Sequence, residues 1–259
     1  MKYSLARYWQ ISPLTDLSVP QDDISFPNPL SNKLPDTLSE SEIAEQEWHL
    51  MHDIEVDDGF LNYPALDLVI EGVDYHAEVR LNGVALFDCD GSQSVYRKPI
   101  KPLLNLGRNR FEILFLEGED DWLLDDECEE LLDCSAAKYD ERIGIWREPY
   151  IDCLSHLRIT GLEAEQVWHY GGGCELVVTI DYDVFKSGLL SASVKFDGLM
   201  LTLPLDMRKN SVEAVYQIDA PDIAGEKPHQ LRIELDEQVY TLPIIFDPNS
   251  PVSSTRVSM

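Results

Sequence analysis

The amino-acid sequence predicts an all-β protein built from two β-sandwich domains, and three observations support this fold class. Apolar and polar residues alternate in short segments, as at Ala77, Val79 and Leu81, which is the pattern of a half-buried strand. Turn-forming pairs such as Asn82-Gly83 and Asp197-Gly198 separate these segments. Neither half of the chain alternates strands with helices, as a parallel α/β fold requires.

The first half of the chain carries several short strands joined by turns. Asn82-Gly83 readily adopts the positive φ angles of a type I′ turn, so it predicts a hairpin. Leu106–Asn109 is a second turn. Short strands at this spacing are typical of a sandwich or a barrel. The strands expected in this half are Leu66–Ile70, Ala77–Leu81, Val84–Phe87, Phe111–Leu116 and Gly144–Asp152.

The segment 1–47 is expected to be an irregular lead-in that wraps the folded body. Proline interrupts it repeatedly, and proline is poorly accepted inside helices and central strands. The prolines in question are Pro13, Pro20, Pro27, Pro29 and Pro35.

The second half of the chain repeats the β character. Leu176, Val178 and Ile180 alternate with other residues, and Asp197-Gly198 predicts another hairpin. About seven strands in about a hundred residues suit an immunoglobulin-like sandwich. The segment 248–259, rich in serine and proline, is expected to be a disordered tail.

Composition excludes several classes of function. With 48 acidic and 20 basic residues among 259, the net charge is −28, which repels nucleic acid. No apolar run approaches the roughly 18–20 residues of a membrane-spanning helix, and Met1–Gln21 lacks the apolar region of a secretory signal. The five cysteines are odd in number and irregularly spaced, which indicates reduced thiols in a cytoplasmic protein.

One ordered series of motifs resembles a known family. The series runs through Trp48, Glu71–Asp74, Leu81–Gly83, Gly107–Asn109 and Gly144–Arg147. It is similar to the N-terminal sugar-binding domain of family 2 glycoside hydrolases, the β-galactosidase and β-mannosidase group. The resemblance implies a galactose-binding-like jelly roll over residues 1–154, followed by an immunoglobulin-like sandwich over 155–247.

The resemblance also implies that the chain has no catalytic residues of its own. In this family a (β/α)8 barrel follows the two sandwiches and supplies two catalytic glutamates. Retaining hydrolysis needs two carboxyl groups about 5 Å apart, and the chain ends about where that barrel would begin. We therefore expect a protein that is not an enzyme.

Trp122, Tyr139 and Asp140 are the candidate carbohydrate-binding residues. Sugar faces stack on aromatic rings and sugar hydroxyls bond to carboxylates, so these three side chains are suited to form a sugar platform. The alternative is that Trp122 only anchors its loop. Trp146 and Arg147 are expected to be structural, with the tryptophan in the core and the arginine paired to a carboxylate.

An acidic stretch between Glu117 and Asp133 raises the question of a metal. Its carboxylates could hold Ca²⁺ through oxygen ligands, but they lack the Asp-x-Asp-x-Asp-Gly register, so a solvated charge run is the main interpretation. No other cofactor and no other metal is expected. The residues concerned are Glu119, Asp120, Asp121, Asp125 and Asp126.

Three functions remain open at this stage. The first is a non-catalytic carbohydrate-binding or accessory protein. The second is a protein-interaction scaffold, or a subunit that partners a separately encoded catalytic barrel through a basic surface. The third and weakest is an intact glycosidase. The expected partners are a carbohydrate or a protein, and neither nucleic acid nor membrane.

Overall fold

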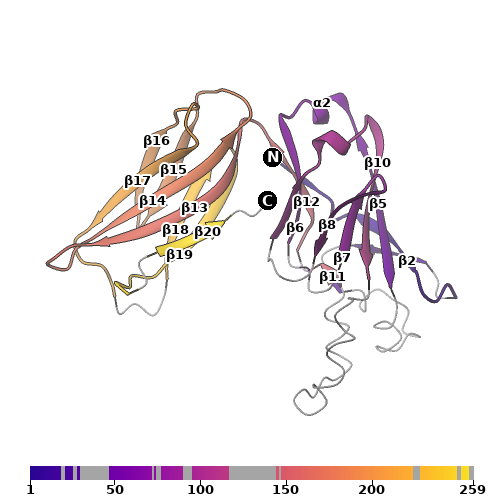
Figure 1. Cartoon of the computed structure of the whole chain (residues 1–259), viewed down its shortest axis with the longest axis horizontal. Helices are drawn as coiled ribbons and strands as arrows, with labels where there is room; N and C mark the ends of the chain where they lie inside the picture. Colours follow the sequence, from indigo (N-terminus) through magenta and orange to yellow (C-terminus); the bar gives the residue numbers. More distant parts are fainter. Residues whose placement is uncertain are drawn as a thin grey trace, which may run out of the picture. The chain divides into compact units, whose positions relative to one another are not determined.

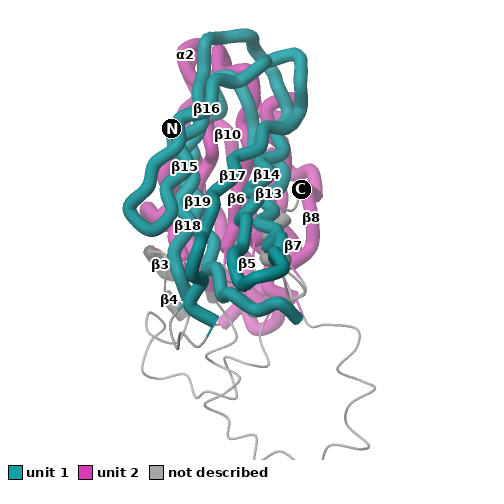
Figure 2. Tube along the Cα trace, turned by 90° about the vertical axis from the view of Figure 1, so that its left-hand side faces the viewer, with its two compact units in different colours: residues 1, 154–259 teal, residues 2–153 magenta. Residues whose placement is uncertain are grey.

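The computed structural model divides the chain into two compact units, residues 2–153 and residues 154–259 together with Met1 (Figures 1 and 2). Each unit consists almost entirely of antiparallel strands, which confirms the predicted jelly-roll and immunoglobulin-like sandwiches. The structure describes residues 1–18, 21–25, 28–29, 47–71, 73, 77–89, 95–116, 144–145, 147–223, 228–249 and 252–256.

The first domain pairs a six-stranded sheet, in the order β3-β2-β5-β10-β7-β8, with a four-stranded sheet, β1-β12-β6-β9. A small sheet joins β11 to β4, and short helical turns occupy Asp58–Leu61 (α2) and Lys101–Leu103. The strands are β1 Lys2–Ser4, β2 Tyr8–Pro13, β3 Asp22–Ser25, β4 Asn28–Pro29, β5 Trp48–Val56, β6 Ala65–Glu71, β7 Ala77–Leu81, β8 Val84–Cys89, β9 Val95–Pro99, β10 Gly107–Phe115, β11 Gly144–Ile145 and β12 Tyr150–Leu154.

The core of this domain follows from the alternation of the sequence. In β5, every second residue from Trp48 to Val56 is buried, while the intervening side chains are more exposed. Because successive strand residues point to opposite faces, one face of each sheet meets the other sheet and excludes water. Trp9, Trp48, Phe111 and Phe115 are the largest side chains of this core.

The turn after β7 has the predicted geometry. Asn82 and Gly83 have φ angles of 53° and 79°, so both adopt the left-handed conformation of a type I′ turn. The side chain of Asn82 also donates to the carbonyl oxygen of Leu103 at 2.9 Å. The hairpin is therefore held both by its backbone conformation and by a contact to a distant loop.

The expected irregular lead-in, 1–47, is wrong for its described part. Residues from this segment form β1, β2 and β3, which extend both main sheets. Trp9 and Ile11 alternate toward the core and are buried. The free energy gained by burying such large apolar side chains exceeds the local cost of the prolines. The prolines are compatible with this arrangement, since Pro13 is the last residue of β2.

The prediction of a single strand over Gly144–Asp152 is also wrong, because the structure has two strands there. β11 ends at Ile145 and β12 begins at Tyr150. Pro149 precedes β12 directly and has no amide hydrogen to donate to a ladder, so pairing cannot run through it.

The second domain is a sandwich of two four-stranded sheets, β17-β14-β13-β20 and β16-β15-β18-β19. Its core gathers the alternating apolar residues of β13, β14, β15, β17, β18 and β19, with partly buried residues of β16 packed against them, and it includes the predicted Leu176, Val178 and Ile180. The strands are β13 Leu157–Trp168, β14 Cys174–Val184, β15 Ser191–Phe196, β16 Leu199–Pro204, β17 Ser211–Ile218, β18 His229–Leu235, β19 Gln238–Ile244 and β20 Val252–Arg256.

The predicted disordered tail is wrong for residues 252–256. They form β20, which pairs antiparallel with β13 in a register that places Val252 opposite Glu165 and Arg256 opposite Gly161. The long strand β13 offers backbone groups on the side away from β14, and satisfying them outweighs the polar composition of the added strand.

The cysteines that the structure describes are unreactive in character. Cys89, Cys153 and Cys174 are all buried. Burial raises the pKa of the Cys153 thiol to about 11 and also raises the pKa of Cys174. The thiols of Cys153 and Cys174 therefore stay protonated at neutral pH and act as small apolar side chains. Cys128 and Cys134 lie outside the described residues.

Candidate functional site

The residues predicted to bind carbohydrate, Trp122, Tyr139 and Asp140, lie outside the described residues, as does the acidic stretch considered for Ca²⁺. Trp146 lies outside them as well. The platform and the calcium site therefore stay predictions. Of Trp146 and Arg147, both expected to be structural, the structure describes Arg147.

A polar pocket of about 360 Å³ lies beside Arg147. It is formed on the four-stranded sheet of the first domain, on the face turned away from the core cluster. Leu68 and Ile70 of β6 and Ile151 of β12 point into that core, so the neighbouring Glu71 and Tyr150 point the other way. The pocket is lined by Lys2, Ser4, Glu71, Arg147, Glu148 and Tyr150.

Glu71 holds the pocket together. One carboxylate oxygen, Oε2, lies 2.9 Å from Nη1 of Arg147, and the other, Oε1, accepts a hydrogen bond of 3.1 Å from the Tyr150 hydroxyl. The side chain of Glu71 is 19% exposed, whereas that of Arg147 is 72% exposed. The predicted pairing of Arg147 with a carboxylate is thus confirmed, and it leaves most of the guanidinium facing solvent.

Tyr150 supplies the aromatic surface of the pocket. Burial, and then the neighbouring Glu71 carboxylate, raises the pKa of the Tyr150 phenol, so the hydroxyl keeps its proton and donates. Nζ of Lys2 lies 3.9 Å from the centroid of the Tyr150 ring, which is a cation–π contact. One aromatic ring therefore connects the positive and negative groups of the site.

The same face of the sheet continues into a buried ionic cluster. Arg97 of β9 bonds to Asp67 of β6 through Nη1 at 3.0 Å and to Asp152 of β12 through Nη2 at 3.1 Å. All three residues are at most 6% exposed. The Arg97 guanidinium thus links three neighbouring strands of the sheet, β12, β6 and β9. Its planar group can bond to two carboxylates at once.

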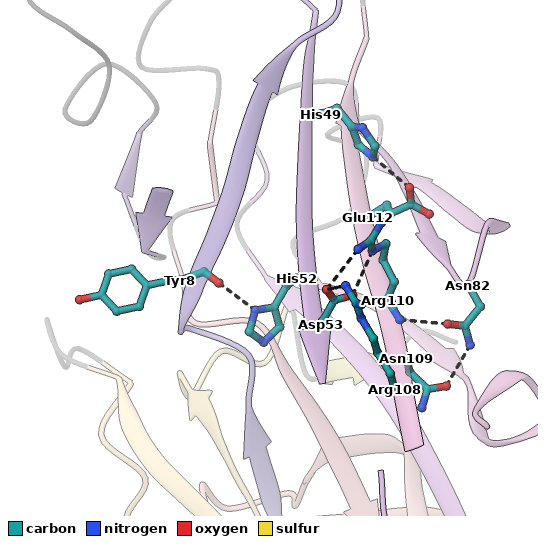
Figure 3. A network of polar contacts seen from close by, with 9 residues as sticks. All are labelled: Tyr8, His49, His52, Asp53, Asn82, Arg108, Asn109, Arg110 and Glu112. Atoms are coloured by element: carbon teal, nitrogen blue, oxygen red, sulfur yellow. Dashed lines mark hydrogen bonds and ion pairs between the residues drawn. The ribbon is translucent and has the colours of Figure 1, made fainter. Parts of the chain in front are cut away.

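A second polar network covers the outer face of the six-stranded sheet (Figure 3). Asp53 of β5 faces Arg110 of β10 in the register of the sheet, and it bonds to Nε and Nη2 of that arginine at 3.0 and 3.2 Å. Arg108 bonds to the same carboxylate. Further along the face, His49 lies 3.0 Å from Glu112. These cross-strand pairs link the two central strands of the sheet.

Asp53 gives this network a defined pH dependence. Hydrogen bonds from Arg110 and then Arg108 lower the pKa of Asp53 to about 2. Because this is below the value of about 3.9 in an unfolded chain, the pair stabilises the fold above about pH 4 and loses that contribution as the pH falls toward 2. The Asp53→Asn variant should lose less stability than the parent between pH 5 and 2 in urea titrations.

Glu55→Gln, two residues further along the same face of β5, is the matched control for this measurement. At pH 7 we expect Asp53→Asn to cost about 1 kcal/mol or less, because the pair is partly exposed to solvent. If both variants keep the acid sensitivity of the parent, the Asp53 network does not contribute to it.

The chemistry available at these sites is hydrogen bonding between ionised groups. Among the residues that the structure describes, the carboxyl groups with a shifted pKa are Asp16, Asp53, Glu78 and Asp206; each of these pKa values is lowered, so the groups stay anionic. A general acid needs the opposite shift. Within the described part of the chain, no group of three or more potential ligands is arranged to hold a metal ion.

Several pocket residues were not predicted from the sequence. Glu71 and Tyr150 stand in the quoted motif segments or beside them, but nothing in the spacing shows that their side chains meet. The one usable signal is the alternation around Ile151, which places Tyr150 and Asp152 on one face. Lys2 was not predicted as a pocket residue, because no local pattern in the sequence links it to Tyr150 at the other end of the domain.

Comparisons with known proteins concern the fold of the two domains. Residues 24–125 match the family described as glycosyl hydrolase 2 galactose-binding domain-like. Over these residues the first domain is similar to this family. The galactose-binding-like domain so identified contains the Glu71 half of the polar pocket, and the resemblance stated from the sequence motifs is confirmed.

Several solved structures with the same fold are glycoside hydrolases. A β-D-mannosidase from Dictyoglomus thermophilum matches with a TM-score of 0.69 at 17% identity, covering 94% of this chain and 36% of that chain. A Bacteroides uniformis β-glucuronidase gives 0.62 at 12% identity, covering 95% and 32%. A glycosyl hydrolase family 2 member from Bacteroides cellulosilyticus gives 0.59 at 13%, covering 98% and 38%.

These structural similarities establish the fold of the galactose-binding-like domain and of the sandwich that follows it. The chain spans about a third of the length of these enzymes. No curated protein matches the sequence. In the part of the chain that the structure describes, no helix is long and apolar enough to cross a membrane.

Proposed function

We propose that this chain is a non-catalytic carbohydrate-binding or accessory protein. The observation that carries the proposal is the polar pocket at the edge of the galactose-binding-like domain, where Glu71 orients Tyr150 and Arg147. A sugar needs an apolar surface for its ring and charged groups for its hydroxyls. Tyr150 supplies the first, while Arg147, Lys2 and Glu148 supply donors and an acceptor.

Calorimetric titration tests the proposal directly. The full chain is titrated with β-galactosides, β-mannosides and β-glucuronides and with their oligomers. We expect at least one class to bind, and Arg147→Met to weaken that binding about tenfold, the loss of one charged hydrogen bond. Arg208→Met, an exposed arginine of the second domain, is the control. Absence of binding across this panel at millimolar concentration would contradict the proposal.

A second arm separates the two candidate surfaces. Trp122→Ala and Asp140→Asn alter the platform predicted from the sequence, whereas Arg147→Met and Tyr150→Phe alter the pocket. Loss of binding only in the first pair would place the sugar on the platform. Loss only in the second pair would place it in the pocket beside Glu71.

The second candidate function is an accessory subunit or scaffold that partners a separately encoded catalytic barrel. The net charge of −28 favours this candidate, since it is complementary to a partner with a basic surface. Co-expression with a barrel-only hydrolase, followed by size-exclusion chromatography at low and high salt, tests it. An intact glycosidase is the weakest candidate, and turnover of chromogenic β-galactosides or β-mannosides by the purified chain would support it.

A further inference from the structure

The edge strand β16 of the second domain is unusually open. It lies at one end of the sheet β16-β15-β18-β19 and, within the described residues, pairs only with β15. Its sequence, Leu199 to Pro204, contains no charged residue, although charged residues make up 26% of the chain. Leu199 and Met200 are 61% and 64% exposed. Edge strands are normally protected by charges, bulges or prolines, and here only the final Pro204 does so.

The hairpin geometry identifies which backbone groups of β16 are open. Phe196 and Leu199 flank the two-residue turn Asp197-Gly198, whose φ angles are 45° and 81°. Residues that flank such a turn form a hydrogen-bonded pair, and the pattern alternates along the ladder. Met200 and Thr202 therefore direct their amide and carbonyl groups away from β15, toward the open side.

A pocket of about 300 Å³ lies on the outer face of this sheet and reaches the edge strand. It is lined by Ser193, Lys195, Met200, Arg232 and Glu234. Lys195 of β15 stands directly opposite Arg232 of β18 in the register. Two like charges in this position repel each other. Arg232 is paired with Glu234 at 2.6 Å, while the described residues offer no ion pair to Lys195.

We propose that β16 is the docking edge for an extended acidic segment of a partner protein. The segment adds to this four-stranded sheet along Met200 and Thr202, in the manner of β-strand addition. One of its carboxylates reaches over Met200 into the pocket and lies between Lys195 and Arg232, which relieves their repulsion. This surface is separate from the sugar pocket, which belongs to the other domain.

A second copy of this chain fits the edge less well. β16 itself carries no carboxylate, so pairing two β16 strands leaves Lys195 without a counter-charge. An acidic partner segment, in contrast, is attracted specifically to the one described sheet face of this domain on which two cations lie opposite each other.

Binding of a fluorescent peptide to the full chain tests the backbone part of the proposal. The probe alternates valine with glutamate, and a second probe replaces each glutamate with lysine. Thr202→Pro removes an outward amide without removing a hydrogen bond to β15, and Thr202→Val is the matched control that keeps the amide. We expect the acidic peptide to bind the parent and Thr202→Val alike, and Thr202→Pro at least about tenfold more weakly.

The charge part is tested independently of the strand. Lys195→Gln should weaken the acidic peptide several-fold and reduce the salt dependence of binding, whereas Lys209→Gln, an exposed lysine outside the pocket, should not. The proposal is overturned if the lysine peptide binds as tightly as the glutamate peptide, if Thr202→Pro binds like Thr202→Val, or if neither probe binds at millimolar concentration. Concentration-dependent dimers that Thr202→Pro abolishes would assign the edge to a second copy instead.

Discussion

Replacing Arg97 with methionine should lower the free energy of unfolding of the first domain by about 3–5 kcal/mol. The substitution keeps the aliphatic volume but removes the guanidinium that bonds to Asp67 at 3.0 Å and to Asp152 at 3.1 Å. Both carboxylates are buried, at 0% and 4% exposure, so water cannot replace the lost charge. The loss should therefore far exceed that of a surface ion pair.

Urea unfolding followed by circular dichroism and tryptophan fluorescence measures this effect. Arg108→Met is the control, because Arg108 also bonds to a carboxylate but is 65% exposed, and we expect it to cost about 1 kcal/mol or less. A loss of less than about 1 kcal/mol for Arg97→Met would show that burying the guanidinium costs nearly as much as its two ion pairs contribute.

Replacing Asn109 with alanine should cost about 3 kcal/mol. This side chain is fully buried and makes four hydrogen bonds. Oδ1 accepts from the Asn82 side chain at 2.9 Å and from the Asn105 amide at 2.8 Å, and Nδ2 donates to the carbonyl oxygens of Asn105 and Gly107 at 2.7 and 2.9 Å. Alanine removes all four hydrogen bonds, three of which hold backbone groups of Asn105 and Gly107 in the turn before β10.

Asn105→Ala is the matched control, since Asn105 contributes only backbone groups to this network. We expect it to change the unfolding free energy by less than about 0.5 kcal/mol. Asn109→Asp provides a second comparison, because it keeps the two acceptor contacts and loses both donors. Equal stability of Asn109→Ala and Asn105→Ala would contradict a structural role for the Asn109 side chain.

The elements predicted correctly are those with a local cause. Alternating Ala77, Val79 and Leu81 form β7, and Asn82-Gly83 adopts the expected positive φ angles, because these properties depend on adjacent residues. Periodicity alone predicted two sandwiches, and the family resemblance also predicted their types and their order. The prediction for Arg147 was correct in kind, since its partner is a carboxylate, but the sequence did not identify that partner as Glu71.

The features that were not predicted depend on residues far apart in the chain. Asp67, Arg97 and Asp152 come from three strands, and no spacing in the sequence shows that these strands are neighbours. The polar composition of residues 252–256 predicted disorder, but these residues form a strand because the backbone of β13 offers hydrogen-bonding groups on the side away from β14. In both cases sheet order decides the structure, and sheet order is a property of the whole domain.

The pairing of β1 with β12 has a consequence for how the first domain is made. Lys2 lies opposite Asp152 and Ser4 opposite Tyr150, so the first strand of this domain pairs with its last. Closing a loop of this length is entropically costly, and folds dominated by such distant contacts form slowly. During translation, β1 must therefore wait unpaired until β12 has left the ribosome.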